Sequence, residues 1–275
     1  MPELAEVEFF RKRWHQAAVG ERVATVLTHD RKRLLRGLNL PQFHRALTGA
    51  QLESSHAAAK QMAFRFSGDV WLGIHLGMSG ELKVEALGYS PGKHDHLVLV
   101  TEGHTLVFTD PRMFGRIEFH VGSDVPHWWK RLAPPILSPA FTVAAVTQFL
   151  TRRGRAPIKA VLLMQERFPG VGNWMADEIL WRSSIHPARR AGTLQPEEIR
   201  TLWRECRTVC RQAFAAVAGR GDTLPANLNV GIPDTWLFNH RWRRGGRCPK
   251  SGRPLAHATI GGRTTCWSPA RQKLK

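Results

Sequence analysis

The chain has 275 residues, of which 40 are Lys or Arg and 22 are Asp or Glu, giving a formal net charge of +18 and a pI near 11.0. Its length suits one large or two ordinary domains, and its composition, 43% hydrophobic and 23% charged, is that of a globular protein. No segment approaches the roughly 18 apolar residues of a membrane span, and the first residues do not form a secretory signal. The four cysteines are too few for a dense disulfide framework. We therefore expect a protein of the reducing cytoplasm.

The excess of basic residues indicates a polyanionic partner. Lys and Arg side chains that neutralise phosphates release counterions, and this release supplies salt-sensitive affinity for nucleic acid. An acidic membrane surface, a ribosomal surface or the general basicity of an Arg-rich proteome would account for the same charge. The charge therefore favours nucleic acid but is compatible with a membrane, a ribosome or a basic proteome.

The first part of the chain is predicted to be a helix followed by antiparallel strands. Residues 2–18 carry apolar side chains at helical spacing, with charges between them. Residues 21–119 contain short strand-like runs separated by Gly, Asp and Ser, at 23–27, 62–66, 70–74, 96–100 and 105–108. The last two runs flank 101–104 and predict a hairpin. We expect a sandwich or barrel of about 100 residues.

A linker and a helical part follow. Residues 122–140 hold four prolines and are predicted to connect a first domain, 1–121, to a second domain, 141–238. The second domain has helical spacing at 144–152, 156–165, 173–184 and 196–217, with a weaker pattern at 233–237. The tail, 239–275, has ten Lys or Arg and no acidic residue, and its apolar residues favour a small β-hairpin over a disordered arm. Those residues are Trp242, Leu255, Ile260 and Trp267.

The first residues carry potential chemistry. If Met1 is removed, Pro2 presents a secondary α-amine, and free α-amines have a pKa of about 7.7 to 8.0, against about 10.4 for Lys. Such an amine can attack C1′ of a sugar to form an iminium ion, and Glu3 beside it could serve as a general acid or base. The alternative is that the Pro-Glu pair only starts a helix.

Seven stretches of the chain, in order, resemble one family of DNA-repair enzymes. They are 2–8, 59–60, 75–80, 93–96, 109–115, 170–178 and 261–265. Together they resemble the formamidopyrimidine-DNA glycosylase and endonuclease VIII family of base-excision repair, over nearly the whole chain. Ala5 departs from the family's opening, where Pro is usual. The resemblance implies an α+β fold with an N-terminal helix plus antiparallel β-sandwich, then a helical helix-two-turns-helix domain with a C-terminal finger.

The resemblance also implies a catalytic group and phosphate ligands. Pro2 would be the Schiff-base nucleophile and Glu3 its acid–base partner, with Glu6 as a supporting carboxylate. Lys60 would be a catalytic-site lysine that pairs with a backbone phosphate beside the lesion and assists proton transfer; without the resemblance it would be a solvated lysine at a strand end. Asn173, in the Gly-Val-Gly-Asn turn before a helix, would bind a phosphate, as helix N-termini do, or serve as a helix cap, and both can hold.

Four further residues are predicted to contact DNA through the resemblance. Met78, Arg112 and Phe114 match the family's void-filling triad, and His94 lies in the Lys-His-Asp-His stretch. A damaged nucleotide must leave the base stack to expose its glycosidic bond, and inserted apolar and planar side chains recover part of that cost. Apart from the family, Met78 and Phe114 would be core residues and Arg112 a turn charge.

The finger departs from the family. Members usually end with four zinc-binding cysteines, and the corresponding positions here are Cys248, Ser251, Ser268 and Arg271. Arg cannot be a ligand and one thiolate is not enough, so a zinc site built from these four residues is excluded. We therefore expect a zincless β-hairpin held by packing of the tail's apolar residues, with no metal and with Arg263 kept at the position where the family grips phosphates.

These features predict a DNA glycosylase with AP lyase activity that works by β,δ-elimination. The triad favours oxidised purines such as formamidopyrimidine and 8-oxoguanine. The short loop at 219–236 instead favours a less selective pocket, which would accept hydantoins or, as in endonuclease VIII, oxidised pyrimidines. We expect a monomer that acts on damaged or abasic double-stranded DNA, needs no cofactor and works in the cytoplasm at the nucleoid. The rivals are a catalytically silent damaged-DNA-binding protein and a basic ribosome-associated factor.

Overall fold

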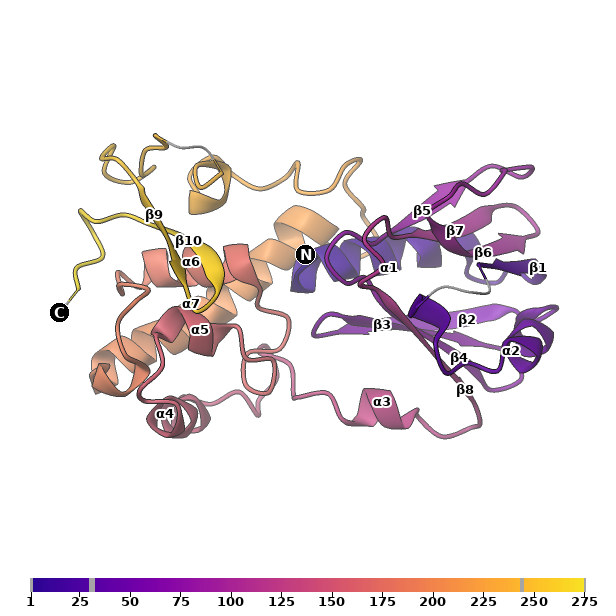
Figure 1. The fold of residues 1–275 in the computed structure, drawn as a ribbon, viewed down its shortest axis with the longest axis horizontal. Helices are drawn as coiled ribbons and strands as arrows, with labels where there is room; N and C mark the ends of the chain where they lie inside the picture. Colours follow the sequence, from indigo (N-terminus) through magenta and orange to yellow (C-terminus); the bar gives the residue numbers. More distant parts are fainter. Residues whose placement is uncertain (1, 30–32, 243–244, 275) are drawn as a thin grey trace. The chain divides into compact units, whose positions relative to one another are not determined.

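The computed structural model describes residues 2–29, 33–242 and 245–274, and the chain forms two compact units (Figure 1). The first, here the β unit, comprises Met1–Leu132 together with Gly221–Leu224. The second, the helical unit, comprises Ala133–Arg220 and Pro225–Lys275. Among the residues described, no helix has the length and apolar character needed to cross a membrane.

The β unit contains two four-stranded antiparallel sheets. The first has the order β1 (Val23–Thr28), β6 (Asp95–Thr101), β7 (Thr105–Thr109) and β5 (Glu81–Glu85). The second has the order β2 (Leu52–Ala58), β3 (Gln61–Phe66), β4 (Val70–His75) and β8 (Arg116–Val121). The predicted hairpin forms between β6 and β7, where the Thr101 backbone N–H donates to the His104 carbonyl over 2.8 Å. The expected helix followed by antiparallel sheets is confirmed.

Four of the five strands found by their sequence pattern, β3, β4, β6 and β7, are mostly buried, whereas β1 has only two buried residues of six. Every residue of β7 and five of six in β4 are buried, so these segments are nearly continuous apolar runs. The strands β2, β5 and β8 were not among the predicted runs, because polar residues occupy their half-exposed faces. The helix α2 (Leu40–Leu47) was also not predicted.

Gly73 is required in β4 because a Cβ there would lie 2.7 Å from the Trp128 ring, which belongs to α3 (His127–Lys130).

The N-terminal helix, α1 (Leu4–Ala18), packs on edge strands of both sheets, β2 and β5. Trp14 is fully buried, its indole N–H donates to the Lys83 carbonyl over 2.8 Å, and its ring lies 5.3 Å from that of Phe64. The Arg11 guanidinium donates to the Ser55 hydroxyl of β2 over 2.8 Å. These contacts fix both the position and the direction of α1 on the sheets.

The helical unit is arranged around one buried helix, α6 (Asn173–Arg182). All eight residues from Trp174 to Trp181 are buried, against α5 (Ile158–Leu162), α7 (Pro196–Ala213) and the C-terminal hairpin. The remaining elements are α4 (Val143–Arg152), a π-helical turn (Phe214–Ala218) and short 3-10 helices at Arg33–Leu35 in the β unit and at Ala191–Thr193 and Leu237–Asn239 here. The weak helical pattern at 233–237 was wrong, because only the last of these residues enters a 3-10 turn.

The tail forms the predicted hairpin, from β9 (Ala256–Ile260) and β10 (Arg263–Trp267). Its turn, Gly261 and Gly262, has φ of +60° and +73°, which only Gly adopts readily, and a Cβ on Gly261 would lie 2.6 Å from Cβ of Ala160. The turn therefore packs closely on α5.

One expectation about the finger's packing was wrong. Trp242 is 62% exposed and stacks on Arg241, instead of packing inside the finger. The buried cluster that holds the finger consists of Trp181, Leu237, Cys248, Leu255 and Cys266. Sequence spacing could not show this, because Trp181 and Leu237 reach the finger from distant parts of the chain.

A buried ion cluster joins the finger to the helices. Asp177 accepts hydrogen bonds from Lys159 Nζ at 2.5 Å, from Arg241 Nη2 at 2.5 Å and from the backbone N–H of Cys266 at 3.1 Å. The side chains of Lys159 and Asp177 are fully buried. Removing one member of such a cluster leaves an uncompensated buried charge, which typically costs about 3–5 kcal/mol. The cluster therefore fixes the finger on α5 and α6.

Candidate active site and nucleic-acid interface

Strand register places several predicted site residues at one end of the second sheet. Gln61 pairs with His75, and His75 pairs with Arg116, so these three residues form a row across β3, β4 and β8. Lys60 directly precedes this row. The loop that carries Met78 begins at this row, because β4 ends at His75. The loop that carries Phe114 ends at this row, because β8 begins at Arg116.

The direction of α1 brings Pro2 and Glu3 to the same end. The helix runs antiparallel to β2, since the Gly20 N–H donates to the Leu52 carbonyl at the start of β2 and Arg11 reaches Ser55 in its middle. From Arg11 back to Glu3 the helix rises about 12 Å. From Ser55 on to Lys60 the strand advances about 16 Å in the same direction. The N-terminus of α1 and the tip of the β2–β3 hairpin therefore lie at a common end of the β unit.

The first turn of α1 is fixed by its own carboxylates. Glu3 is the N-cap, its backbone N–H donates to Glu6 Oε2 over 2.6 Å, and its side chain accepts from the backbone at Glu6 in a capping box. Both residues are buried, Glu3 to 2% exposure. Pro2 is half-buried and immediately precedes the box, whereas Met1 lies outside the described residues. The box thus holds the backbone that carries the Pro2 nitrogen.

Lys60 lies in a two-residue turn between β2 and β3. Ala59, the first residue of the turn, has φ of +55°, a left-handed conformation that costs a non-glycine residue free energy. Burial and the nearby cations Arg116 and Lys60 lower the pKa of His75 to about 4, and its Nδ1 accepts from the Gly77 N–H at 3.0 Å. His75 is therefore neutral at pH 7, with its proton on Nε2. The sequence reasoning did not single out His75, although it lies in a matched stretch.

The two loops of the triad are locked together by a buried carboxylate. Asp110 is fully buried and accepts from the Ser79 hydroxyl at 2.6 Å and from the Gly115 N–H at 2.7 Å. Gly77 has φ of +65°, and a Cβ there would lie 2.3 Å from the carbonyl carbon of Phe114. The loop 76–80 and the loop 110–115 therefore form one unit.

The triad side chains stand out from this unit. Phe114 is 51% exposed, and the Arg112 guanidinium carbon lies 5.1 Å from the centroid of its ring. Met78 is half-buried. Phe114 is thus not a core residue, and a large exposed aromatic stacked by a cation is suited to contact a base.

His94 lies beside the same loops, just before β6. Its carbonyl accepts from the Asp110 N–H at 3.0 Å, and its side chain is half-buried. The structure therefore brings eight of the predicted residues to one end of the β unit: Pro2, Glu3, Glu6, Lys60, Met78, His94, Arg112 and Phe114.

The two remaining predicted residues come together in the helical unit. Asn173 opens α6, and its Nδ2 donates to the Thr264 carbonyl over 2.8 Å, directly beside Arg263 at the exposed start of β10. Lys159 Nζ donates to the Asn173 carbonyl over 2.6 Å, which fixes the helix start from behind. Lys159 was not predicted, because only its partners in the fold distinguish it from a surface lysine.

The loop that follows α7 is attached to α1 at its beginning. Lys12 is buried, and its Nζ donates to the Gly221 carbonyl over 2.7 Å, while the Gln16 amide donates to the Asp222 carbonyl over 2.5 Å. Further along, a Cβ on Gly231 would lie 2.3 Å from the Ala216 carbonyl oxygen. The loop 219–236, whose length bears on specificity, is therefore held at both of these points.

The donor set of the finger does not fit zinc. Within residues 2–29, 33–242 and 245–274 no group of three or more His, Cys, Asp or Glu is placed to hold a metal ion. Cys248 is buried, and the Trp181 indole N–H donates to its sulfur over 3.3 Å. Burial disfavours the thiolate, but hydrogen bonds from Ser251 and Trp181 outweigh it and lower the pKa of Cys248 to about 7. The thiol is thus held by hydrogen bonds and apolar packing.

Comparison with known proteins identifies the family. A model of the formamidopyrimidine-DNA glycosylase N-terminal domain matches residues 1–117, and a model of the family's H2TH domain matches residues 132–223. The formamidopyrimidine-DNA glycosylases of Roseiflexus sp. and Geobacter sulfurreducens are 34% and 35% identical to the chain, with 99% of this chain and 100% of each relative covered. The chain belongs to the formamidopyrimidine-DNA glycosylase family. It is therefore a DNA glycosylase of base-excision repair.

Solved structures agree with this membership. A MutM complex with carbocyclic 8-oxo-G containing DNA has a TM-score of 0.85 and 25% identity, covering 99% of this chain and 100% of the other. The Lactococcus lactis formamidopyrimidine-DNA glycosylase in complex with DNA containing an oxidised pyrimidine has the same score, identity and coverage. The α+β fold and the family predicted from the sequence are confirmed.

The depressed pKa of His75 predicts acid-sensitive stability. Between pH 6.5 and about 4 the unfolded chain binds the proton that folded His75 does not, so stability is complete above pH 6.5 and falls with the pH, by roughly 3 kcal/mol at pH 4. His75→Gln, which can still accept from Gly77, should remove this component in urea unfolding at a series of pH values. The exposed His127→Gln is the control, and equal pH slopes in all three proteins would contradict the assignment.

The donor chemistry of the finger predicts folding without zinc. Purified protein should contain no stoichiometric zinc by elemental analysis, and a chelator should leave its melting temperature unchanged, because hydrogen bonds and packing hold Cys248. Stoichiometric zinc that disappears in Cys248→Ala would overturn this expectation.

Proposed function

We propose that the chain is a bifunctional DNA glycosylase and AP lyase that uses the Pro2 nitrogen as its nucleophile. The observation that carries the proposal is the capping box at the start of α1, which fixes Pro2 beside the buried Glu3 at the end of the β unit that also carries Lys60 and the triad. A protein that only binds DNA needs no fixed N-terminal amine. This placement therefore favours an enzyme over the catalytically silent rival.

The chemistry follows from the two groups. With Met1 removed, the lone pair of Pro2 nitrogen attacks C1′ of the damaged nucleotide, and the glycosidic bond breaks as the base leaves with a proton. Glu3 supplies and removes protons at the sugar. Glu3 then protonates O4′ as the C1′–O4′ bond breaks, and because Pro2 is a secondary amine the ring-opened adduct is an iminium ion. Loss of a C2′ proton expels the 3′ phosphate, and a second elimination expels the 5′ phosphate, so the strand is cut by β,δ-elimination without a cofactor.

Hydrogen-bond donors of each unit would hold the phosphates of the DNA. In the β unit these are Lys60, His75 and His94, and His75 in its neutral form offers an N–H without a charge. In the helical unit they are Arg263 and the amide of Asn173, which the contact to Thr264 brings together. Each phosphate contact made by a Lys or Arg adds to the salt dependence of binding. We propose that damaged or abasic double-stranded DNA is the partner and that the chain acts as a monomer.

The triad would fill the space left by the extruded nucleotide. Unstacking a base costs a few kcal/mol, and an aromatic side chain that stacks in its place recovers part of this cost. Phe114 is exposed and held on a fixed loop, Met78 adapts its shape, and Arg112 can reach the edge of the unpaired base.

The substrate class is proposed to include oxidised purines and oxidised pyrimidines. The triad favours formamidopyrimidine and 8-oxoguanine, and relatives of this fold are solved with 8-oxo-G and with oxidised pyrimidine DNA. The loop 219–236 is fixed to α1 at Gly221 and to Ala216 at Gly231, which leaves a short free span to cover a lesion. Hydantoins therefore belong to the proposed range, and a preference for oxidised pyrimidines is the second candidate.

Borohydride trapping tests the nucleophile. Protein whose mass shows that Met1 is absent should form a covalent adduct with duplexes that contain an abasic site or 8-oxoguanine in the presence of borohydride. Protein acetylated at Pro2 should form none. If processed protein forms no adduct on any oxidised or abasic duplex, the chain is a binding protein.

A second arm of this experiment separates the roles of the two residues. Glu3→Gln should lower excision of the damaged base about 10²- to 10⁴-fold, since general acid–base catalysis is lost, while the amide can still accept the capping hydrogen bond. Glu8→Gln on the same helix is the matched control, because Glu8 pairs with Arg11 at a site the reaction does not use. Equal rates for both variants would exclude Glu3 as the acid–base group.

Phe114→Ala should slow excision from a fully paired duplex about tenfold or more, because less of the unstacking cost is recovered. The effect should be smaller when the lesion lies in an unpaired bubble, where the base is already unstacked. Met113→Ala is the control, since Met113 is also exposed, at 39%, in the same loop. Single-turnover rates on both substrates give the comparison, and equal losses in paired and unpaired DNA would contradict the wedge role.

A further inference from the structure

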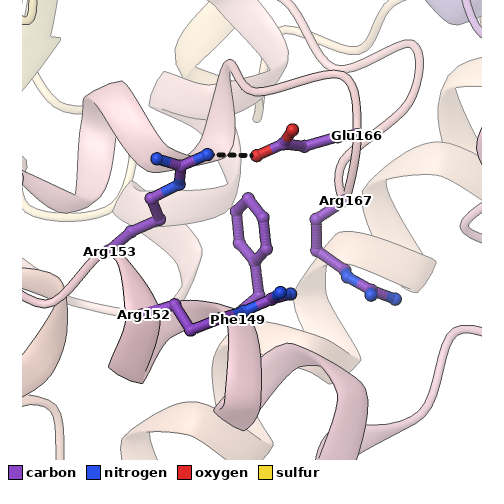
Figure 2. Close-up of a pocket in the computed structure, with 5 residues that line it drawn as sticks. All are labelled: Phe149, Arg152, Arg153, Glu166 and Arg167. Atoms are coloured by element: carbon purple, nitrogen blue, oxygen red, sulfur yellow. Dashed lines mark hydrogen bonds and ion pairs between the residues drawn. The ribbon is translucent and has the colours of Figure 1, made fainter.

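The helical unit carries a basic pocket that the candidate site does not use. It lies at the end of α4 and is lined by Phe149, Arg152, Arg153, Glu166 and Arg167, with a volume of about 370 Å³ (Figure 2). Figure 2 shows the ring of Phe149 between Arg153 and Arg167. We refer to this group of residues as the arginine pocket. None of its residues belongs to the seven stretches that resemble the family.

Three guanidinium groups converge on one aromatic ring there. Their central carbons lie 5.6 Å (Arg152), 5.7 Å (Arg153) and 5.8 Å (Arg167) from the centroid of Phe149. Phe149 is only 3% exposed, so its ring forms the floor of the pocket. Cation–π attraction helps to hold such groups, but three positive charges around one ring repel each other.

The protein's own acidic residues neutralise only part of this charge. Glu166 pairs with Arg153 over 2.7 Å, and it is the sole carboxylate among the described residues that line the pocket. Arg167 Nε is buried and has no hydrogen-bond partner within the described part of the chain. The Arg167 guanidinium is therefore not saturated by acceptors of the described residues.

The positive charge continues along the turn that follows α4. An adjoining hollow is lined by residues 151–156, which adds Arg155 to the same surface. This turn is rigid, because the Gly192 N–H donates to the Gly154 carbonyl over 3.0 Å and a Cβ on Gly192 would lie 2.9 Å from Gly154 Cα. The backbone that carries these arginines is therefore held in place, and the guanidinium groups of Arg152 and Arg153 also contact Phe149.

We propose that the arginine pocket binds a backbone phosphate of DNA and so extends the contact of the helical unit beyond the lesion. The inference rests on the proposed function, which makes DNA the partner. Arginine forks match the geometry of phosphate oxygens, and Arg152 and Arg167 are not engaged by any carboxylate of the described residues. An acidic protein surface would offer carboxylates instead and is an outcome of the test.

The test compares Arg152→Gln/Arg167→Gln with the control Arg200→Gln/Arg204→Gln, which removes the same charge from α7. Equilibrium binding is measured over a range of salt concentrations on two duplexes that contain an abasic analogue. One duplex is short and covers only the lesion, and the other is long and extends beyond it. On the long duplex the pocket variant should lower the slope of log Kd against log salt by about 1, since one phosphate contact contributes about 0.9. The slope on the short duplex and the excision rate there should stay at the wild-type values.

Glu166→Gln supplies the opposite change. It removes the pocket's own anion and frees Arg153, so binding to the long duplex should become tighter and more sensitive to salt. An unchanged slope in the pocket variant, or the same loss in the control variant, would overturn the proposal. Tighter binding of an acidic peptide than of the long duplex, abolished in the pocket variant, would assign the pocket to a protein partner instead.

The two proposals fail separately. Inorganic pyrophosphate should raise the melting temperature of the wild type and not that of the pocket variant, and this readout requires neither excision nor the N-terminal amine. If pyrophosphate and the long duplex behave as expected but no borohydride adduct forms, the pocket stands and the enzyme assignment falls. If adducts form but slopes and melting temperatures are unaffected by the pocket variant, the pocket is only a solvated cluster.

Discussion

The buried carboxylate of Asp177 is the interaction on which the helical unit depends. It neutralises Lys159 of α5 and Arg241 of the finger and accepts the backbone N–H of Cys266. Lys159 also holds the Asn173 carbonyl at the start of α6. One carboxylate thus fixes a helix start, a neighbouring helix and a hairpin, and through this cross-link the finger can keep Arg263 in place without metal ligands.

Asp110 plays the same physical role in the β unit. It is fully buried, accepts from Ser79 and Gly115, and so joins the loop of Met78 to the loop of Phe114. In both units the residues proposed to meet DNA are exposed or half-buried, whereas the carboxylate that positions them is fully buried and accepts several hydrogen bonds. This division separates affinity from stability, because exposed cations can bind phosphates while hydrogen bonds inside keep the loops ordered.

The sequence predicted elements whose pattern is local. Helix α1, the buried strands and the hairpin β9–β10 follow from apolar spacing and from the Gly261–Gly262 turn, and the candidate residues followed from the matched stretches. Features that depend on long-range contacts could not be predicted. The strands β2 and β5 are edge strands with polar faces, and nothing in the sequence shows that Trp242 lies at the surface. Lys159 resembles any surface lysine in the sequence, and only the fold brings its Nζ to 2.5 Å from Asp177. His75 required the register that places it between Gln61 and Arg116.

Two strained residues directly precede proposed site residues. Ala59, before Lys60, has φ of +55°, and Met113, before Phe114, has φ of +54°. Neither side chain can offset this conformation with a local hydrogen bond, as Asn or Asp can, so each costs of order 1–3 kcal/mol and persists only where its surroundings impose it. The surroundings do impose it, through the Ala58–Gln61 pairing and through the Asp110 contacts to the Arg112 and Gly115 N–H groups. The fold therefore gives up stability at the turns that aim Lys60 and Phe114, which is the expected pattern where side chains must be held ready for a partner.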